Sequence, residues 1–165
     1  MDSYSMVFEK IFEVPETPWK EGLRKACRGV LIDENGQIPL LFVSRENYYK
    51  LPWWWMEWDE DKIETLRREV LEEAGCEIDN IEEIWCTIEK NFTWSQISYC
   101  FVARVVNKWN AEYTLEEIYD WFTLKWVKRD EALSFMKDIV PFTENGKRKQ
   151  ERESFILENV LQHLG

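Results

Sequence analysis

Histidine is nearly absent from this sequence of 165 residues, which contains one, His163. Catalytic triads built on histidine and metal sites built on several histidines are therefore nearly excluded. The four cysteines show no C-x-x-C spacing, so we interpret them as free structural thiols of a reduced, cytoplasmic protein. Any catalysis must then depend on carboxylates and a metal ion.

Basic residues and long apolar runs are also in short supply. The chain has 21 Lys plus Arg against 32 Asp plus Glu, which gives a net charge of -11. Such a surface repels a polyphosphate backbone, so we expect no nucleic-acid polymer as a partner and a bridging cation for any phosphate ligand. No segment is long and apolar enough to span a membrane, and the opening MDSYSMVFEK lacks the features of a secretory signal.

Glycine is scarce too, with six glycines beside ten tryptophans. Apolar residues nevertheless make up 45% of the chain and aromatic residues 15%, which is enough material for a sizeable core. We therefore expect one globular domain over residues 1–165.

Apolar periodicity predicts alternating strands and helices. Two β-branched runs flank DENG, which predicts a hairpin with strands over 27–33 and 38–45. A helix is predicted over 60–76, because acidic residues occupy its first turn and Gly75 its end. Further strands are predicted over 81–92, 95–106 and 121–127, and further helices over 129–138 and 147–164. The combination predicts an α/β or α+β sandwich with a mixed sheet.

Three glutamates, Glu69, Glu72 and Glu73, share one face of the helix predicted over 60–76. Like charges at this spacing repel by about 0.2 to 0.5 kcal/mol per pair, and the single guanidinium of Arg68 cannot neutralise all three. Oxygen ligands without histidine or thiolate favour Mg²⁺ or Mn²⁺. A solvated acidic face without a metal explains the same spacing, so the helix alone leaves both interpretations open.

The residues around these glutamates follow a longer pattern. Glu60 comes six places after Trp54, and residues 68–76 read REVLEEAGC. This spacing resembles the Nudix box, G-x5-E-x7-R-E-U-x-E-E-x-G-U with U a bulky apolar residue, at every defined position except the first glycine. The preceding YKLP and the later LKWVKRDEAL are also similar to the family.

The resemblance implies an α/β/α sandwich with a mixed β-sheet, and a hydrolase that uses Mg²⁺ or Mn²⁺. Its substrate would be a small nucleoside diphosphate derivative or a nucleoside triphosphate, cleaved at a diphosphate bond by water. Metal ions suit this reaction, because they neutralise the diphosphate and lower the pKa of bound water. The metal ligands that the resemblance implies are Glu69, Glu72, Glu73 and the backbone carbonyl of Trp53.

Other site residues are also implied by the resemblance. Arg68 would orient the glutamates and complete the catalytic set, and Glu60 would brace the start of the helix. The candidates for substrate binding are Tyr48, Trp53 and Trp54. Further acids that could act as a base or ligand, or as plain surface acids, are Glu57, Glu117 and Asp120. Further aromatic residues that either stack on a base or belong to the core are Tyr49, Phe92, Trp94 and Trp126.

The segment before the helix departs from the family, which typically has LPGGGxExGE where this chain has LPWWWMEWDE. Glycine allows positive φ and a close approach of the backbone to ligands, whereas a left-handed conformation costs about 1 to 2 kcal/mol for another residue. We therefore expect an irregular loop that impairs the site, and we interpret the chain as an altered or engineered Nudix sequence.

A rival interpretation is a non-catalytic protein with the Nudix fold that uses Trp53, Trp54, Trp55 and Trp58 as a contact surface. Four indoles bring about 150 to 250 Å² each, which exceeds the largest apolar patch usual on a monomer, about 300 to 600 Å². This interpretation predicts binding or self-association, for example as a homodimer. Metal-dependent turnover distinguishes the two.

Overall fold

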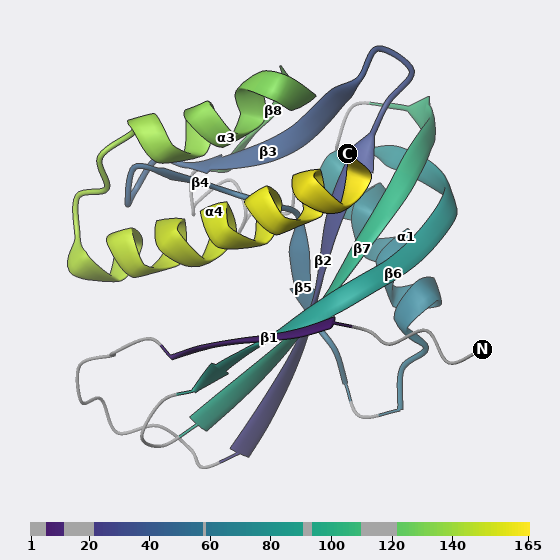
Figure 1. Cartoon of the computed structure of the whole chain (residues 1–165). Coiled ribbons are helices and arrows are strands. Elements are labelled where there is room, and N and C mark those ends of the chain that lie inside the picture. Colours follow the sequence, from purple (N-terminus) through teal and green to yellow (C-terminus); the bar gives the residue numbers. More distant parts are fainter. Residues whose placement is uncertain (1–5, 12–21, 58, 91–93, 110–121) are drawn as a thin grey trace.

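The computed structural model describes residues 6–11, 22–57, 59–90, 94–109 and 122–165, which form two β-sheets and three helices (Figure 1). The larger sheet has the strand order β1 (Met6–Ile11), β6 (Cys76–Lys90), β7 (Trp94–Lys108), β2 (Gly22–Ile32) and β5 (Trp53–Trp55). The smaller sheet has the order β4 (Tyr48–Lys50), β3 (Gln37–Val43) and β8 (Phe122–Lys128). The helices are α1 (Lys62–Ala74), α3 (Arg129–Asp138) and α4 (Glu144–Leu164).

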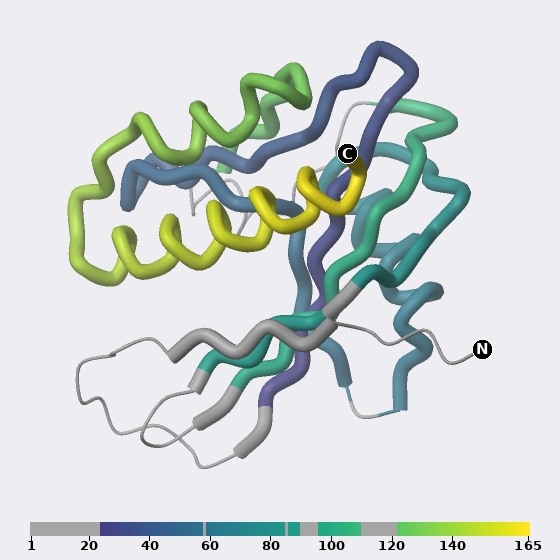
Figure 2. Tube along the Cα trace, viewed as in Figure 1, coloured from purple at the N-terminus to yellow at the C-terminus, as the bar shows by residue number. Residues whose placement is uncertain are grey.

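The larger sheet is mixed, as predicted. β1 runs parallel to β6, and β2 runs parallel to β7, whereas β6 and β7 are antiparallel to each other. The trace in Figure 2 shows β6, β7 and β2 crossing the molecule side by side. The smaller sheet is antiparallel throughout.

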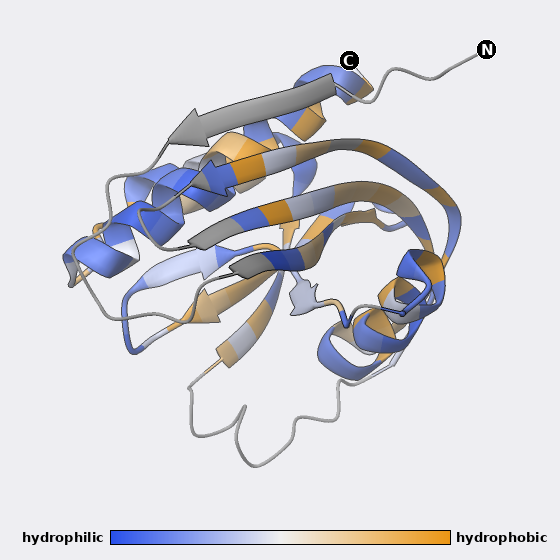
Figure 3. Ribbon diagram, turned by 90° about the horizontal axis from the view of Figure 1, so that it is seen from below, coloured by the Kyte–Doolittle hydropathy of each residue, from blue (hydrophilic) through white to orange (hydrophobic). Residues whose placement is uncertain are grey.

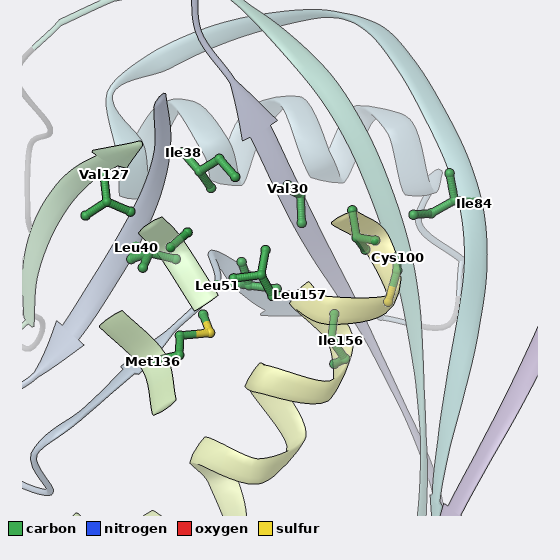
Figure 4. Close-up of a cluster of buried hydrophobic side chains, with 12 residues drawn as sticks. Val30, Ile38, Leu40, Leu51, Ile84, Cys100, Val127, Met136, Ile156 and Leu157 are labelled. Carbon is green, nitrogen blue, oxygen red and sulfur yellow. The ribbon is translucent and has the colours of Figure 1, made fainter. Parts of the chain in front are cut away.

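Helices cover both faces of the larger sheet. Alternate residues of one strand point to opposite faces, and Leu31 of β2 belongs to a buried cluster with Leu66 and Val70 of α1. Its neighbour Val30 belongs to a second cluster with Ile156 of α4. Figure 4 shows this second cluster between the strands and the helix, and Figure 1 shows α1 and α4 on opposite sides of β2 and β7.

These layers confirm the predicted α/β fold with a mixed sheet, here arranged as an α/β/α sandwich. The hydropathy colours in Figure 3 show apolar segments along the strands and a mixture of polar and apolar segments on the helices. Within the part of the chain that the structure describes, no helix combines the length and the apolarity that crossing a membrane requires.

The hairpin predicted around DENG is only partly right. The turn is present, because the Asp33 amide donates to the Gln37 carbonyl at 3.0 Å and Gly36 has a φ of 72°. The two strands then separate, with β2 in the larger sheet and β3 in the smaller one. β2 pairs with β7 and β5, and β3 pairs with β4 and β8, so the two strands of the predicted hairpin belong to different sheets.

The irregular loop expected at the tryptophans is wrong for Trp53–Trp55, which form strand β5. β5 pairs antiparallel with β2, and Trp54 lies opposite Cys27. The only non-glycine residues with positive φ among those described are Asn47 and Asn80. The three tryptophans therefore avoid the left-handed conformation whose cost we estimated from the sequence, while Trp58 lies outside the described residues.

Candidate active site

Helix α1 is held at both ends by local signals. The Asp61 side chain accepts hydrogen bonds from the amides of Ile63 and Glu64, at 2.9 and 3.0 Å. At the other end Gly75 adopts a left-handed φ of 61°, and its amide donates to the Leu71 carbonyl at 3.1 Å. Both caps satisfy backbone groups that a helix end leaves open. The predicted helix over 60–76 is thus confirmed, with slightly shorter bounds.

The glutamates of α1 lie beside its buried stripe. Glu72 is exposed, whereas Glu69 and Glu73 are half-buried. Arg68 donates to Glu69 at 3.1 Å and to Glu60 at 3.4 Å. Burial and the charge of Glu72 raise the pKa of Glu69, although the hydrogen bond from Arg68 works in the other direction. Negative charge is therefore crowded on this face, and a bound cation would relieve the repulsion.

Glu60 connects the segment before α1 to the first turns of the helix. Its carboxylate accepts from the Glu57 amide and from the Thr65 hydroxyl, both at 3.3 Å, in addition to Arg68. The Glu57 amide is the largest influence that lowers the pKa of Glu60. These contacts join Glu60 to the segment before α1 and to its first turns, and the bracing role of Glu60 stays a prediction. The side chain of Glu57 itself is exposed.

Lys50 interacts with Glu73 of α1, although no sequence pattern predicts this interaction. Its side chain is buried, and its ammonium lies 4.2 Å from the ring centroid of Phe122 and 5.2 Å from that of Trp53. Burial lowers the pKa of Lys50, and the charges of Glu73 and then Glu153 oppose this shift. Lys50 therefore interacts electrostatically with Glu73 of α1 and with Glu153 of α4.

The donor set suits a divalent metal ion in its chemistry and spacing. Glutamates three and four apart on a helix are neighbours, and their oxygens are the ligands that Mg²⁺ and Mn²⁺ prefer. Among the described residues, no three acidic, histidine or cysteine side chains stand close enough to hold an ion as they are oriented. Glu69 instead faces Arg68, and one oxygen of Glu73 is buried. Binding a metal therefore requires side-chain rotation of these glutamates.

The three tryptophans of β5 have different environments. Trp54 is 4% exposed and belongs to the core cluster beneath α1, whereas Trp55 is 47% exposed. Trp53 is half-buried, and its ring makes an edge contact with that of Trp55 at a centroid distance of 4.9 Å. The Arg28 guanidinium lies over the indole ring of Trp53, 5.4 Å from its centroid. Trp54 is thus part of the core, and Trp53 lies at the site.

A cavity of about 450 Å³ adjoins Trp53. Its lining residues are Val43, Arg45, Glu46, Tyr48, Lys50, Trp53, Phe122, Thr143, Lys149 and Arg152. Two of the predicted substrate-binding residues, Tyr48 and Trp53, therefore meet at one cavity. The cations from α4 were missed, because their positions along the chain give no sign that they approach β4.

The other candidate aromatic and acidic residues lie either in the core or outside the described residues. Tyr49 contacts the rings of Phe42 and Phe135, and Trp126 packs against the cluster beneath α1. The candidates that lie outside the described residues are Phe92, Glu117 and Asp120, together with the side chain of Trp94.

A buried carboxylate behind the cavity positions the segment before β5. Glu153 of α4 is fully buried and accepts from Arg28 and Arg152 at 3.2 Å, and from the Leu51 amide at 3.1 Å. Burial works to raise the pKa of Glu153, but the charges of Arg28 and Arg152 outweigh it and hold the pKa below its usual value. A Glu inside the apolar stripe of α4 was the sequence signal that could have identified it.

Comparisons with known proteins agree with this architecture. The sequence profile described as the NUDIX domain matches residues 22–145. MutT from Bacillus halodurans superposes with a TM-score of 0.60 and 22% sequence identity, over 84% of this chain and 82% of its own. A MutT structure from work on Aliivibrio salmonicida and Vibrio cholerae gives a TM-score of 0.50 and 12% identity, over 68% and 83%. No curated protein sequence matches this chain.

The chain therefore belongs to the Nudix family of hydrolases, because the family profile spans most of it. Members of this family generally depend on a divalent metal ion, and the structural neighbours share the fold of this chain. At these identities the neighbours support the fold alone, so the reaction must be argued from the residues.

Proposed function

We propose that this protein is a Mg²⁺-dependent Nudix hydrolase that cleaves a diphosphate bond in a nucleoside diphosphate derivative or a nucleoside triphosphate. The observation that carries the proposal is the helix α1, on which Glu69, Glu72 and Glu73 crowd one face while Arg68 bridges Glu69 to Glu60. A metal ion would let this acidic protein bind an anionic substrate, because the metal mediates between the substrate and the anionic helix.

Each residue has a distinct role in the proposed site. Glu69, Glu72 and Glu73, with the Trp53 carbonyl, would hold Mg²⁺, which when bound neutralises the diphosphate and lowers the pKa of water. Arg68 would release Glu69 to the metal and orient it, while its contact with Glu60 keeps the guanidinium in place. One of the glutamates would accept the proton of the attacking water, as general base catalysis requires.

Glu72→Gln tests the proposal, with Glu64→Gln as its matched control. Both glutamates are exposed on α1 and both changes remove one negative charge, but Glu64 lies in the first turn, outside the proposed ligand set. The rate of hydrolysis of a nucleotide panel in Mg²⁺ should fall more than about 100-fold in Glu72→Gln. Mutation of a residue that only supports a metal ligand already lowers metal affinity or activity about 10- to 100-fold. Glu64→Gln should retain turnover.

Two results would overturn the proposal. The first is no turnover across the panel together with no binding of Mg²⁺ or Mn²⁺ by calorimetry. The second is turnover that survives in Glu72→Gln as well as in Glu64→Gln.

Self-association stays a separate prediction. Among the described tryptophans of β5, Trp55 has the largest exposed surface, whereas Trp54 contributes to the core. Light scattering of Trp55→Ser beside the unchanged chain therefore tests the homodimer more directly than replacing all four tryptophans.

A further inference from the structure

The cavity beside Trp53 reverses the charge of the molecule locally. Its lining contains four cationic side chains, Arg45, Lys50, Lys149 and Arg152, against one carboxylate, Glu46. The chain as a whole carries a net charge of -11. A concave, cationic site on an acidic protein concentrates anions where the rest of the surface repels them.

Lys50 is the cation whose position most needs an anionic ligand. Its side chain is 6% exposed, and the charges of Glu73 and Glu153 oppose the effect of its burial. The rings of Trp53 and Phe122 flank its ammonium and supply cation–π contacts. A buried ammonium carries a desolvation penalty, and a bound anion in the cavity would offset more of it.

The neighbouring cations are held in place from behind. Lys149 pairs with Glu46 at 2.7 Å, while Arg152 pairs with Glu89 at 3.3 Å and with Glu153 at 3.2 Å. These pairs fix the side chains at the cavity wall before any ligand arrives. Donors that are already oriented bind an anion without the entropic cost of ordering them.

We infer that this cavity binds a phosphate monoester of the substrate, in addition to the diphosphate that the glutamates of α1 would process. A phosphate monoester carries a charge of about -1.5 to -2 and three acceptor oxygens, which matches a wall of ammonium and guanidinium donors better than an uncharged base would. The inference rests on the proposed function, and it narrows the substrate to nucleoside diphosphate derivatives that carry a further phosphate. Trp53 connects the two parts, because it lines the cavity and its carbonyl belongs to the proposed metal ligands.

Binding of adenosine 3′,5′-bisphosphate in EDTA, measured by calorimetry, tests the cavity without hydrolysis. Lys149→Met and Lys147→Met form a matched pair on α4, since each removes one lysine charge, but Lys147 is exposed, pairs with Glu144 and does not line the cavity. Lys149→Met should weaken binding about tenfold, as expected for one charge-assisted hydrogen bond, and Lys147→Met should leave it nearly unchanged. Lys50→Met should weaken it at least as much, with thermal unfolding as the check on folding.

Absence of binding would overturn the inference. An equal loss of affinity in Lys147→Met and Lys149→Met would also overturn it, because the effect would then come from overall charge.

A second experiment tests the substrate class by comparing the hydrolysis of coenzyme A with that of its form without the 3′-phosphate, both in Mg²⁺. We expect kcat/KM to be about tenfold higher for coenzyme A, and Lys149→Met to reduce this preference. Equal values for the two compounds would overturn the assignment to a substrate phosphate.

The two proposals fail in different ways. Binding of the bisphosphate that depends on Lys149, without hydrolysis of any compound, would overturn the proposed function and retain the anion site. Hydrolysis with no preference and no metal-free binding would retain the function and overturn the anion site.

Discussion

Replacing Trp54 with alanine should destabilise the fold far more than replacing Trp55, although both belong to the same short strand. Trp54 is 4% exposed and packs with Leu66 and Val70 of α1. Burial of a tryptophan removes about 150 to 250 Å², which at about 25 cal/mol per Å² amounts to roughly 4 to 6 kcal/mol. Core substitutions of this kind cost about 3 to 5 kcal/mol in practice, and we expect Trp54→Ala to fall in that range.

Trp55 is 47% exposed, and its described ring contacts are with Trp53 and Arg24. An edge contact between rings contributes about 0.5 to 1.5 kcal/mol, so Trp55→Ala should cost about 1 to 2 kcal/mol. A third variant, Trp54→Phe, keeps most of the ring and removes an indole N–H that has no hydrogen-bond partner among the described residues. A buried donor without a partner costs about 1 to 3 kcal/mol, so this change should be mild, within about 1 kcal/mol.

Urea denaturation with tyrosine and remaining tryptophan fluorescence measures these differences, with m-values checked for two-state behaviour. Equal losses for Trp54→Ala and Trp55→Ala would refute the assignment of Trp54 to the core. So would a gain in stability when Trp54 is changed to glycine. The same reasoning singles out Trp53→Gly as the glycine variant that enlarges the cavity without emptying the core.

Three further predictions concern the framework around the site. Glu153→Gln should lower the free energy of unfolding by about 3 to 5 kcal/mol, because it leaves the buried Arg28 without its carboxylate. Glu158→Gln changes an exposed ion pair of the same helix and should lower it by less than about 1 kcal/mol. Urea denaturation of the two variants measures this difference. The pKa of Glu153 is depressed in the folded state, so its carboxylate stabilises the fold above the unfolded value of about 4.3. This stabilisation is lost as the pH falls through the folded pKa. The free energy of unfolding should therefore fall less steeply with decreasing pH in Glu153→Gln than in the unchanged chain. Gly75→Ala should cost about 1 to 2 kcal/mol, because Gly75 has a φ of 61°, and thermal unfolding with no change in Tm would contradict this.

Helix α1 and the spacing of its glutamates could be predicted because their signals are local. Asp61 caps the first turn, Gly75 ends the last turn, and the residues between them repeat at helical spacing. The turn after β2 is equally local, since Asp33 accepts from the amides of Asn35 and Gln37. Such features depend on residues a few positions apart, so a single sequence is enough to identify them.

The conformation of the tryptophan segment could not be predicted from local sequence signals. Glycine-like strain was expected at Trp53–Trp55, but pairing with β2 holds them in extended backbone. The same pairing divides their roles, with Trp54 in the core, Trp55 exposed and Trp53 at the cavity. A strand alternates its side chains between faces, and the sequence could not show that these residues form a strand.

The sequence by itself determined the family, the helix α1 and the spacing of its glutamates, because each depends on residue type and short spacing. The tertiary structure decided which strands pair, which tryptophans are buried, and which cations meet across the cavity. Lys50 comes from β4 and Arg152 from α4, and both line one cavity, next to the point where the Leu51 amide donates to Glu153. Contacts between residues this far apart depend on packing of the whole chain, which local patterns do not encode.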